Sequence, residues 1–111
     1  MWIVINYKKK ELNILKEEIK KKIDICAKFY NPKIHYFKKM NNKLQKYQKY
    51  ILDNYVFCFS SNFKENRFKN KINFCRGLNY ILSGFQTDQN EIMRFIDLCK
   101  SYENQEGSID K

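Results

Sequence analysis

The chain is predicted to be one domain of mixed α/β (α+β) class. Two observations favour this class. Short runs of β-branched and aromatic residues alternate with stretches in which apolar residues recur every three or four positions. The 111 residues, 43% of them hydrophobic, supply enough apolar surface for one core but not for two.

The first strand and the first helix are predicted close to the N-terminus. Trp2–Tyr7 is β-branched and aromatic and is followed by three lysines, as is typical of a short strand. From Glu11 onward the apolar residues recur with a helical period while lysines and glutamates occupy the other face, which predicts an amphipathic helix. Its apolar stripe consists of Leu12, Leu15, Ile19, Ile23 and Cys26.

A hairpin and a central strand are predicted in the middle of the chain. Pro32 ends any helical tendency. After it, Ile34, Tyr36 and Met40 alternate with polar residues around a turn rich in Lys and Asn, which predicts a second strand and a hairpin. Residues 49–61, KYILDNYVFCFSS, carry apolar side chains on both faces, as does a central strand that is covered on both sides.

The C-terminal half is predicted to hold a strand between two helices. Asn62–Phe74 has a weak helical pattern, and Leu78–Leu82 is a short apolar run between two glycines. A last helix is predicted to begin at Thr87 or Asp88, because Glu91 follows Asp88 at the capping-box spacing. Its apolar stripe consists of Ile92, Phe95, Ile96 and Cys99.

The order of these elements indicates the architecture. Strand, helix, strand, strand, helix, strand and helix is the order of a ferredoxin-like split βαβ sandwich, with a four-stranded, mainly antiparallel sheet and about three helices. The domain is predicted to span residues 1–102. The remaining residues 103–111, ENQEGSIDK, are polar and are predicted to be a linker or tail.

The chain is strongly basic. Its 22 Lys and Arg residues exceed its 12 Asp and Glu residues, which gives a net charge of +10 and favours a phosphate-rich or acidic partner. Most of the excess is lysine, and it comes with abundant Asn, Ile, Tyr and Phe. An AT-rich genome would impose the same mixture through codon bias, so both interpretations of the charge stay open.

The sequence does not predict metal or catalytic chemistry. The cysteines Cys26, Cys58, Cys75 and Cys99 are widely separated, with no Cys-x-x-Cys pair, so we expect buried reduced thiols rather than a zinc site. His35 is the sole histidine, and there is no P-loop or dinucleotide-binding glycine pattern, so we expect neither enzyme activity nor a cofactor. The apolar start is too short for a leader or a membrane anchor, which predicts a cytoplasmic protein.

Three segments, taken in order, resemble the N-terminal (NGN) domain of the NusG family. They are MWIVINY at residues 1–7, LDNYVFCF at 52–59 and RGLNYILSGF at 76–85. In the family the first begins with tryptophan, the second has the form Phe-Pro-Gly/Asn-Tyr-aliphatic-Phe, and the third begins with Arg/Pro-Gly-Val. Leu52 and Asp53 replace the family's Phe and Pro, which suggests a divergent factor closer to RfaH. The family's second domain, a small KOW barrel, is not expected in this chain.

The resemblance implies a monomeric transcription elongation or antitermination factor that binds RNA polymerase. Carried over by position, the surface for the polymerase clamp helices would consist of Asn6, Leu52, Asp53, Tyr55, Phe57, Met93 and Ile96. The basic residues near the upstream or non-template DNA would be Lys20, Lys21, Lys22 and Arg76. Lysines at the end of a helix also complement its dipole without any partner. Residues 68–71 would lie near the polymerase gate loop, but they lack the His-Thr-rich signature of RfaH.

Two other interpretations stay open. An exposed sheet that carries Tyr55, Phe57 and Phe59 would suit an RRM-like module that binds single-stranded RNA, although the Gly-rich RNP pattern is missing. The chain also fits a protein-interaction domain that binds no nucleic acid. In addition, Tyr55 and Phe57 fit ordinary core positions beneath a helix.

Overall fold

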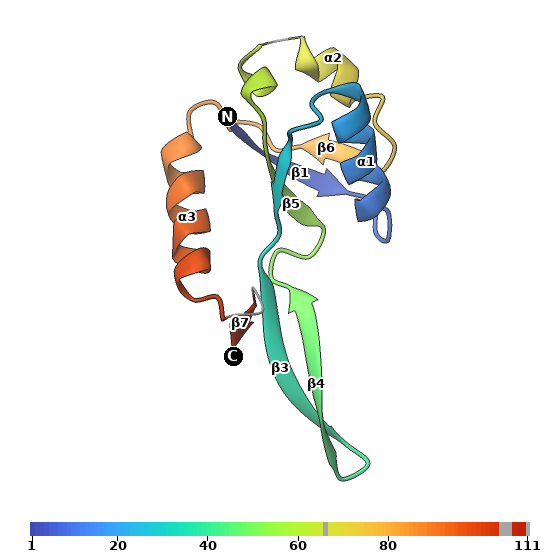
Figure 1. The fold of residues 1–111 in the computed structure, drawn as a ribbon, viewed down its shortest axis with the longest axis vertical. Helices are drawn as coiled ribbons and strands as arrows, with labels where there is room; N and C mark the ends of the chain where they lie inside the picture. The colour runs from blue at the N-terminus through green and yellow to red at the C-terminus, as the bar shows by residue number, and fades with distance from the viewer. Residues whose placement is uncertain (66, 105–107, 111) are drawn as a thin grey trace.

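A four-stranded antiparallel sheet with helices on both faces forms the body of the protein (Figure 1). The computed structural model describes residues 1–65, 67–104 and 108–110. The elements are β1 (Trp2–Tyr7), α1 (Leu12–Lys22), β2 (Lys28–Tyr30), β3 (Lys33–Met40), β4 (Lys43–Tyr50), β5 (Tyr55–Phe59), the 3-10 helix η1 (Ser61–Lys64), α2 (Phe68–Ile72), β6 (Leu78–Ile81), α3 (Gln89–Ser101) and β7 (Ile109–Asp110). The sheet order is β2-β5-β1-β6, and each neighbouring pair is antiparallel. This is the ferredoxin-like order, so the predicted fold class is confirmed.

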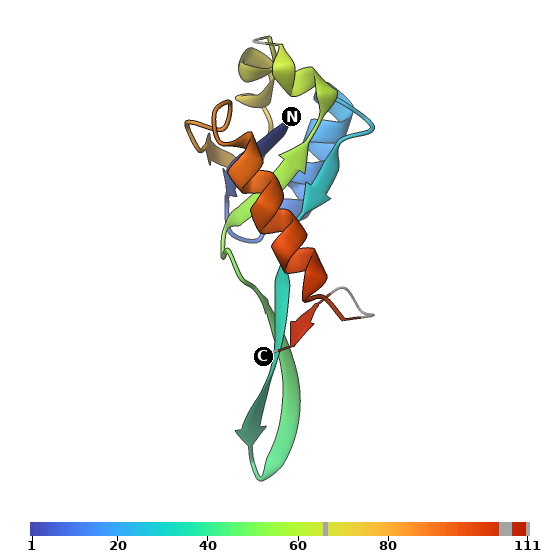
Figure 2. The same ribbon diagram turned by 90° about the vertical axis from the view of Figure 1, so that its left-hand side faces the viewer.

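The larger part of the core lies between this sheet and the two helices α1 and α2, and Ile92 and Ile96 of α3 join it from the other face. On β1, alternate side chains are buried: Ile3 and Ile5 are fully buried, and Tyr7 is nearly so. Such alternation places Trp2, Val4 and Asn6 on the opposite face of the sheet. The main partners of the buried side chains are Leu12, Leu15 and Ile19 from α1, Val56 and Cys58 from β5, and Phe68 and Ile72 from α2. A third helix, α3, lies across the other face (Figure 2).

A long hairpin, β3–β4, projects away from the sandwich (Figure 1). Its two-residue turn consists of Asn41 and Asn42, which both have positive φ angles (51° and 61°). This is the backbone that a tight turn between twisted strands requires, and Asn tolerates it better than most residues. The hairpin explains why the molecule measures 54 Å along its longest axis and only 28 and 23 Å across.

The predicted hairpin after Pro32 is therefore confirmed. The prediction that its first strand is the second strand of the four-stranded sheet is wrong, because β3 belongs to a separate sheet with β4 and β7. That place in the four-stranded sheet is taken by β2, which precedes the buried Pro32.

The first helix is shorter than predicted. It ends at Lys22, because the Asp24 side chain stabilises a turn directly after the helix. The Asp24 carboxylate accepts hydrogen bonds from the N–H of Cys26 (2.8 Å) and from the hydroxyl of Ser60 (2.6 Å). Cys26 is consequently exposed, and the prediction that all four cysteines are buried is wrong for this one. The other three cysteines are buried reduced thiols.

Three other elements differ from the predictions. The apolar run 49–61 is divided by a turn in which Asp53 has a φ of 52°, so β4 ends at Tyr50 and β5 begins at Tyr55. The predicted second helix consists of η1 and the short α2. At the start of α3, Asp88 occupies the N-cap position, but its side chain makes no capping hydrogen bond.

The predicted polar tail is partly ordered structure. Ile109 and Asp110 form β7, which is parallel to the start of β3, and Ser108 is 1% exposed. Glu103 pairs with Ile109 in an isolated bridge and accepts a hydrogen bond from the hydroxyl of Tyr30. These contacts contradict a linker for residues 103, 104 and 108–110, whereas 105–107 and 111 lie outside the described residues.

We predict that Gly77→Ala lowers the free energy of unfolding by about 3 kcal/mol. Gly77 has a φ of 94°, and a Cβ there would lie 2.9 Å from the carbonyl oxygen of Glu11 and 3.1 Å from the Cβ of Leu15. Gly84→Ala is the matched control. It also has a positive φ, of 84°, but its nearest neighbour is a movable Asp88 carboxylate oxygen at 3.3 Å, so we expect a loss of about 1 kcal/mol. Urea unfolding measures both, and equal losses would contradict the close approach of α1 to this loop.

Candidate interaction surface

Helix α3 crosses the sheet obliquely and covers only part of its face (Figure 2). Its first residue, Gln89, is tied to β1: the side-chain amide accepts the N–H of Trp2 (2.8 Å) and donates to the Trp2 carbonyl (2.6 Å). Farther along, the ring of Phe95 lies 5.7 Å from that of Phe57 on β5. Past the end of α3, Glu103 bonds Tyr30 on β2. The helix therefore covers the sheet from the start of β1 to β2.

The opposite part of the same face is uncovered. Asn6 on β1 is paired in register with Tyr55 on β5 and with Tyr80 on β6, which places these three side chains in one row across the sheet. The two tyrosine hydroxyls are 2.7 Å apart, and Asn6 accepts a hydrogen bond from Asn79 (2.9 Å). The hydrogen bond to Tyr55 raises the pKa of Tyr80. The row is thus an ordered polar border, and Tyr80 remains 48% exposed.

An apolar hollow lies between this row and α3. It has a volume of about 480 Å³. Its lining residues are Val4, Phe57, Leu82, Ser83, Phe85, Asp88, Glu91, Ile92 and Phe95. We call it the α3 hollow. Hydrophobic side chains form most of the lining, and two carboxylates, from Asp88 and Glu91, lie at its α3 side. A hollow of this kind suits an apolar side chain from a partner that carries positive charge nearby.

Exposed apolar side chains on α3 and at its C-cap residue extend the hollow along the helix. Phe95, Leu98 and Tyr102 are 36%, 55% and 66% exposed, and their spacing places them within about 60° of one another around the helix. We call them the α3 stripe. Leu82, at the end of β6, adds a further side chain that is 39% exposed. Adjacent exposed apolar groups of this size are typical of interaction sites.

The residues predicted to bind polymerase do not form one surface. Asn6 and Tyr55 lie together on the uncovered part of the sheet, and Phe57 contributes the floor of the hollow but is only 5% exposed. Ile96, at 2%, belongs to the core rather than to a surface, because its position on α3 faces the sheet. Met93 is 49% exposed. However, it points to the other side of α3, about 200° away from Phe95.

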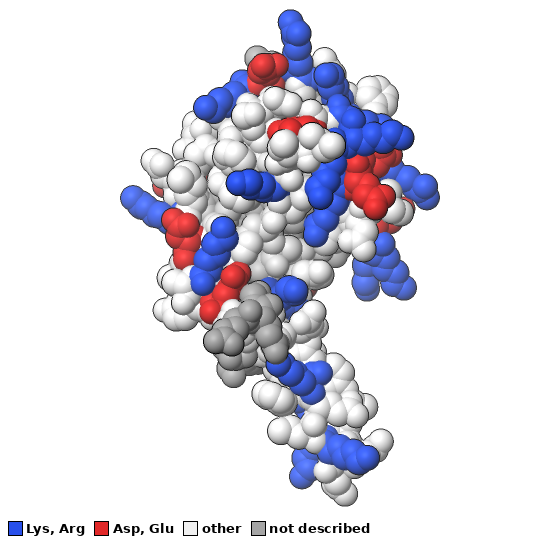
Figure 3. Space-filling view, in the orientation of Figure 1, with Lys and Arg blue, Asp and Glu red and all other residues white. Residues whose placement is uncertain are grey.

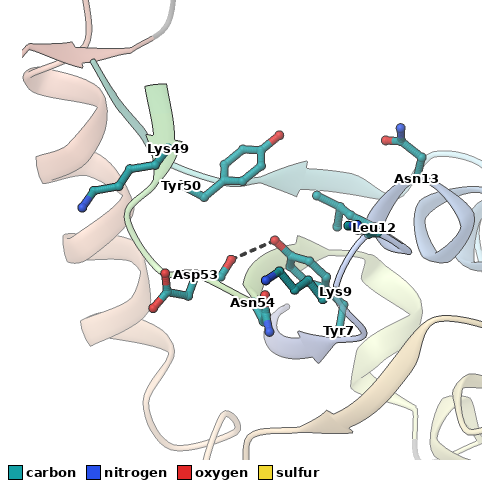
Figure 4. A pocket seen from close by; sticks show the side chains of 9 residues that line it. Tyr7, Lys9, Leu12, Asn13, Lys49, Tyr50, Asp53 and Asn54 are labelled. Carbon is teal, nitrogen blue, oxygen red and sulfur yellow. Dashed lines mark hydrogen bonds between the residues drawn. The ribbon is translucent and has the colours of Figure 1, made fainter. Parts of the chain in front are cut away.

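The remaining two predicted positions lie at the base of the hairpin, in the turn between β4 and β5. Leu52 is half-buried and packs against the core, and Asp53 is exposed. Asp53 lines a second hollow, of about 430 Å³, between this turn and the loop after β1 (Figure 4). Tyr7 donates a hydrogen bond to the Asp53 carbonyl there (2.8 Å), and burial raises the pKa of its hydroxyl. Asp53 therefore lies apart from the α3 hollow.

Several residues of the candidate surface were not predicted. They are Val4, Tyr80, Leu82, Leu98 and Tyr102. The available signal was the spacing Phe95, Leu98 and Tyr102, which forms a second apolar stripe beside the buried one. One helix with two adjacent apolar stripes has more apolar surface than a single contact with the sheet can cover.

The surface does not suit the RRM-like alternative. That interpretation requires Tyr55, Phe57 and Phe59 to be open to stacked bases. Phe57 is covered by α3, and Phe59 is half-buried with its ring 5.3 Å from that of Trp2. Bases therefore have no access to Phe57 while α3 is in place.

The predicted DNA-contacting residues lie on and near α1, on the far side of the sheet. Lys20 and Lys21 are exposed. Lys22 is 3.2 Å from the carboxylate of Glu18, whose pKa it lowers, and it donates to the carbonyl of Phe74 (3.1 Å). The guanidinium of Arg76 is 4.0 Å from the carboxylate of Glu11. Two of the four cations thus already have carboxylate neighbours.

The segment predicted to lie near the gate loop is α2 itself. Phe68 is 4% exposed, because its ring packs between those of Phe63 (4.9 Å) and Phe85 (6.0 Å). Only Lys69, Asn70 and Lys71 of this segment are exposed. An aromatic contact with a partner through Phe68 is therefore excluded in this conformation.

The family models and the curated proteins offer no relative of this chain, since none of them matches it. In the described part of the chain, no group of three or more His, Cys, Asp and Glu side chains could hold a metal ion. Nor does any helix within residues 1–65, 67–104 and 108–110 have the length and apolar character needed to cross a bilayer. The resemblance to NusG consequently stays a prediction that depends on the three segments described above.

We predict that Phe57→Ala destabilises the fold far more than Phe95→Ala. Truncating the covered ring of Phe57 should lower the free energy of unfolding by about 3–5 kcal/mol. Phe95 is 36% exposed, so we expect a loss of about 1–2 kcal/mol. Urea unfolding measures both variants. Equal losses would mean that α3 does not cover β5 in solution.

Proposed function

We propose that the chain is a transcription elongation or antitermination factor module of the NusG N-terminal type, which docks on the clamp helices of RNA polymerase through the α3 hollow and the α3 stripe. The observation that carries this proposal is the apolar hollow beside a half-covered sheet, flanked by exposed apolar side chains on one helix. The ferredoxin-like strand order and the three family-like segments support the choice of partner.

The shape and chemistry of the surface support a helical partner. A helix presents apolar side chains in rows three and four residues apart, and such rows fit a hollow that is bordered by another helix. Burying one large apolar side chain contributes about 1.5–3 kcal/mol. Two or three such side chains, for example one in the hollow and two on the stripe, would supply most of the binding energy of a modest interface.

Charge supports a partner with basic residues at the contact. Asp88 and Glu91 border the hollow, although the chain as a whole has a net charge of +10. Acidic residues at this one apolar site favour a partner in which Lys or Arg adjoins the inserted apolar side chain, and disfavour acidic partners. The surface therefore selects its partner by both size and charge.

The proposed role requires binding and no covalent chemistry. The resemblance implies that a domain of this type spans the polymerase cleft and so suppresses pausing. Such a factor would act in the cytoplasm. It would act as a monomer, because one copy carries the whole docking surface. The α1 lysines and Arg76 would then be free to lie near the upstream or non-template DNA, at the cost of loosening the ion pairs of Lys22 and Arg76.

We predict that Leu98→Arg and Leu82→Arg each weaken binding to a purified clamp-helix fragment by about tenfold or more. Each variant places a charge on the apolar surface, while the side chain it replaces is already 55% or 39% exposed, so the fold should be retained. Phe74→Arg is the matched control, since Phe74 is 78% exposed and follows α2, which lies against the other face of the sheet. Biolayer interferometry measures the affinities, and circular dichroism confirms the fold.

Two outcomes would contradict the proposal. If the unmodified chain does not bind the clamp-helix fragment, the partner is wrong. If it binds and Phe74→Arg weakens binding as much as Leu98→Arg, the α3 surface is not the docking site. A transcription assay with purified polymerase provides a second readout, in which the unmodified chain should shorten pauses and Leu98→Arg should not.

A further inference from the structure

The β3–β4 hairpin carries a concentration of positive charge that the docking surface does not explain. Residues 25–52 contain no Asp or Glu. Within that stretch, the hairpin contains Lys33, Lys38, Lys39, Lys43, Lys46 and Lys49. Figure 3 shows Lys side chains along the projecting hairpin and no acidic ones. Codon bias favours lysine over the whole chain, but it does not remove carboxylates from one segment.

The lysines of the hairpin also have a structural role. Lysines on an open strand edge discourage pairing with another sheet. In the described residues β4 is such an edge, since it pairs with β3 alone. In the part of the chain that the structure describes, the outer part of β3, which carries Lys38 and Lys39, is an open edge as well, because β7 pairs with β3 only at Ile34 and His35. Edge protection therefore accounts for lysines on both strands, but it does not account for the exposed ring of Phe37 among them.

The two faces of the hairpin differ in how they use their aromatic rings. On one face, Tyr36 and Tyr47 stack on each other at 5.7 Å, and the Lys49 ammonium lies 5.7 Å from the Tyr36 ring. The Tyr47 hydroxyl also has two acceptors within hydrogen-bond distance for its one proton, the Met40 sulfur (3.0 Å) and the Gln45 side-chain oxygen (2.8 Å). The two aromatic rings on this face therefore already have partners within the hairpin.

The other face leaves its ring open. Phe37 is 62% exposed. It is paired in register with Lys46, and Lys39 follows it on the same face about 7 Å away. Leu44, which is paired with Lys39, is 70% exposed. We call this the Phe37 face. It presents an exposed apolar ring with one lysine opposite it on β4 and another two residues along β3.

We propose that the hairpin binds single-stranded nucleic acid, with a base stacked on Phe37 and the phosphates held by the surrounding lysines. A lysine neutralises a phosphate, and an aromatic ring stacks on the π-face of any base, so a site that contains both binds single strands with little sequence preference. In a duplex the bases are already stacked on one another and would not reach Phe37. The site lies on the hairpin, away from α3, so a strand bound there leaves the docking surface accessible (Figure 1).

The test is fluorescence anisotropy with a short labelled oligothymidine and the corresponding oligouridine. The first variant combines Lys33→Gln, Lys39→Gln and Lys46→Gln, the three lysines that the register places on the Phe37 face. We expect its affinity to fall at least tenfold and the dependence of log K on log salt to decrease by about 2, because each phosphate contact contributes about 0.7 for a single strand. The matched control, Lys64→Gln, Lys69→Gln and Lys71→Gln, removes the same charge from exposed positions on η1 and α2 and should change the affinity by less than about threefold.

A second variant, Phe37→Ala, tests the stacked base. We expect its affinity to fall about tenfold while the salt dependence stays unchanged, because the variant removes stacking and no charge. Its side chain is mostly exposed, so the fold should be retained, and circular dichroism checks this.

Three results would overturn the proposal. If the control triple variant loses as much affinity as the hairpin triple variant, binding follows net charge alone. If a duplex of equal length binds as tightly and Phe37→Ala has no effect, no base stacks on the ring. If anionic vesicles bind through the hairpin and oligonucleotides do not, the partner is a membrane surface. Clamp-helix binding should be unchanged in both hairpin variants, and oligonucleotide binding should be unchanged in Leu98→Arg, so failure of one proposal is distinguishable from failure of the other.

Discussion

The attachment of α3 to the sheet determines which surfaces of this protein are open. Strand β6 pairs with β1 only from Ile5 onward, so the peptide group of Trp2 has no strand beside it on that edge. The Gln89 amide fills this place with two hydrogen bonds and thereby fixes the start of the helix. From there α3 runs over Phe57 toward Tyr30. One side-chain amide thus directs the helix across β5 and β2 and leaves the β1–β6 side of the sheet with its hollow.

Local patterns in the sequence were sufficient for most of the elements. Trp2–Tyr7, the strand after Gly77 and the final helix each carry their own periodicity, and the structure contains all three. The breaks between elements were harder to predict. The apolar pair Ile51 and Leu52 hides a turn that depends on the positive φ of Asp53, and the three residues of β2 are too few to show any period. The pairing of β7 with β3 joins residues far apart in the chain, so no local pattern reports it.

The candidate site was predicted less well, because a surface depends on the phase of a helix against its sheet. Met93 and Phe95 are both apolar residues of α3, and only their rotation relative to Ile92 and Ile96 decides which one borders the hollow. The sequence identified the buried stripe but did not show on which side of it the sheet remains open. For the basic hairpin, the sequence alone shows part of the candidate site. Its missing carboxylates are visible in the sequence, whereas the open ring of Phe37 depends on the cross-strand register.

Because β3 and β4 pair regularly along their whole length, the number of residues in each strand sets both the reach of the hairpin and the direction of its side chains. Eight residues per strand extend about 27 Å from the sandwich, so strand length sets how far the tip lies from α3. Side chains alternate between faces, so relatives that differ by one residue in each strand would turn every side chain beyond the change to the opposite face. Relatives that differ by two residues in each strand would keep the same face and change only the reach. Lengths that vary in steps of two among relatives would therefore indicate selection on which way the tip faces.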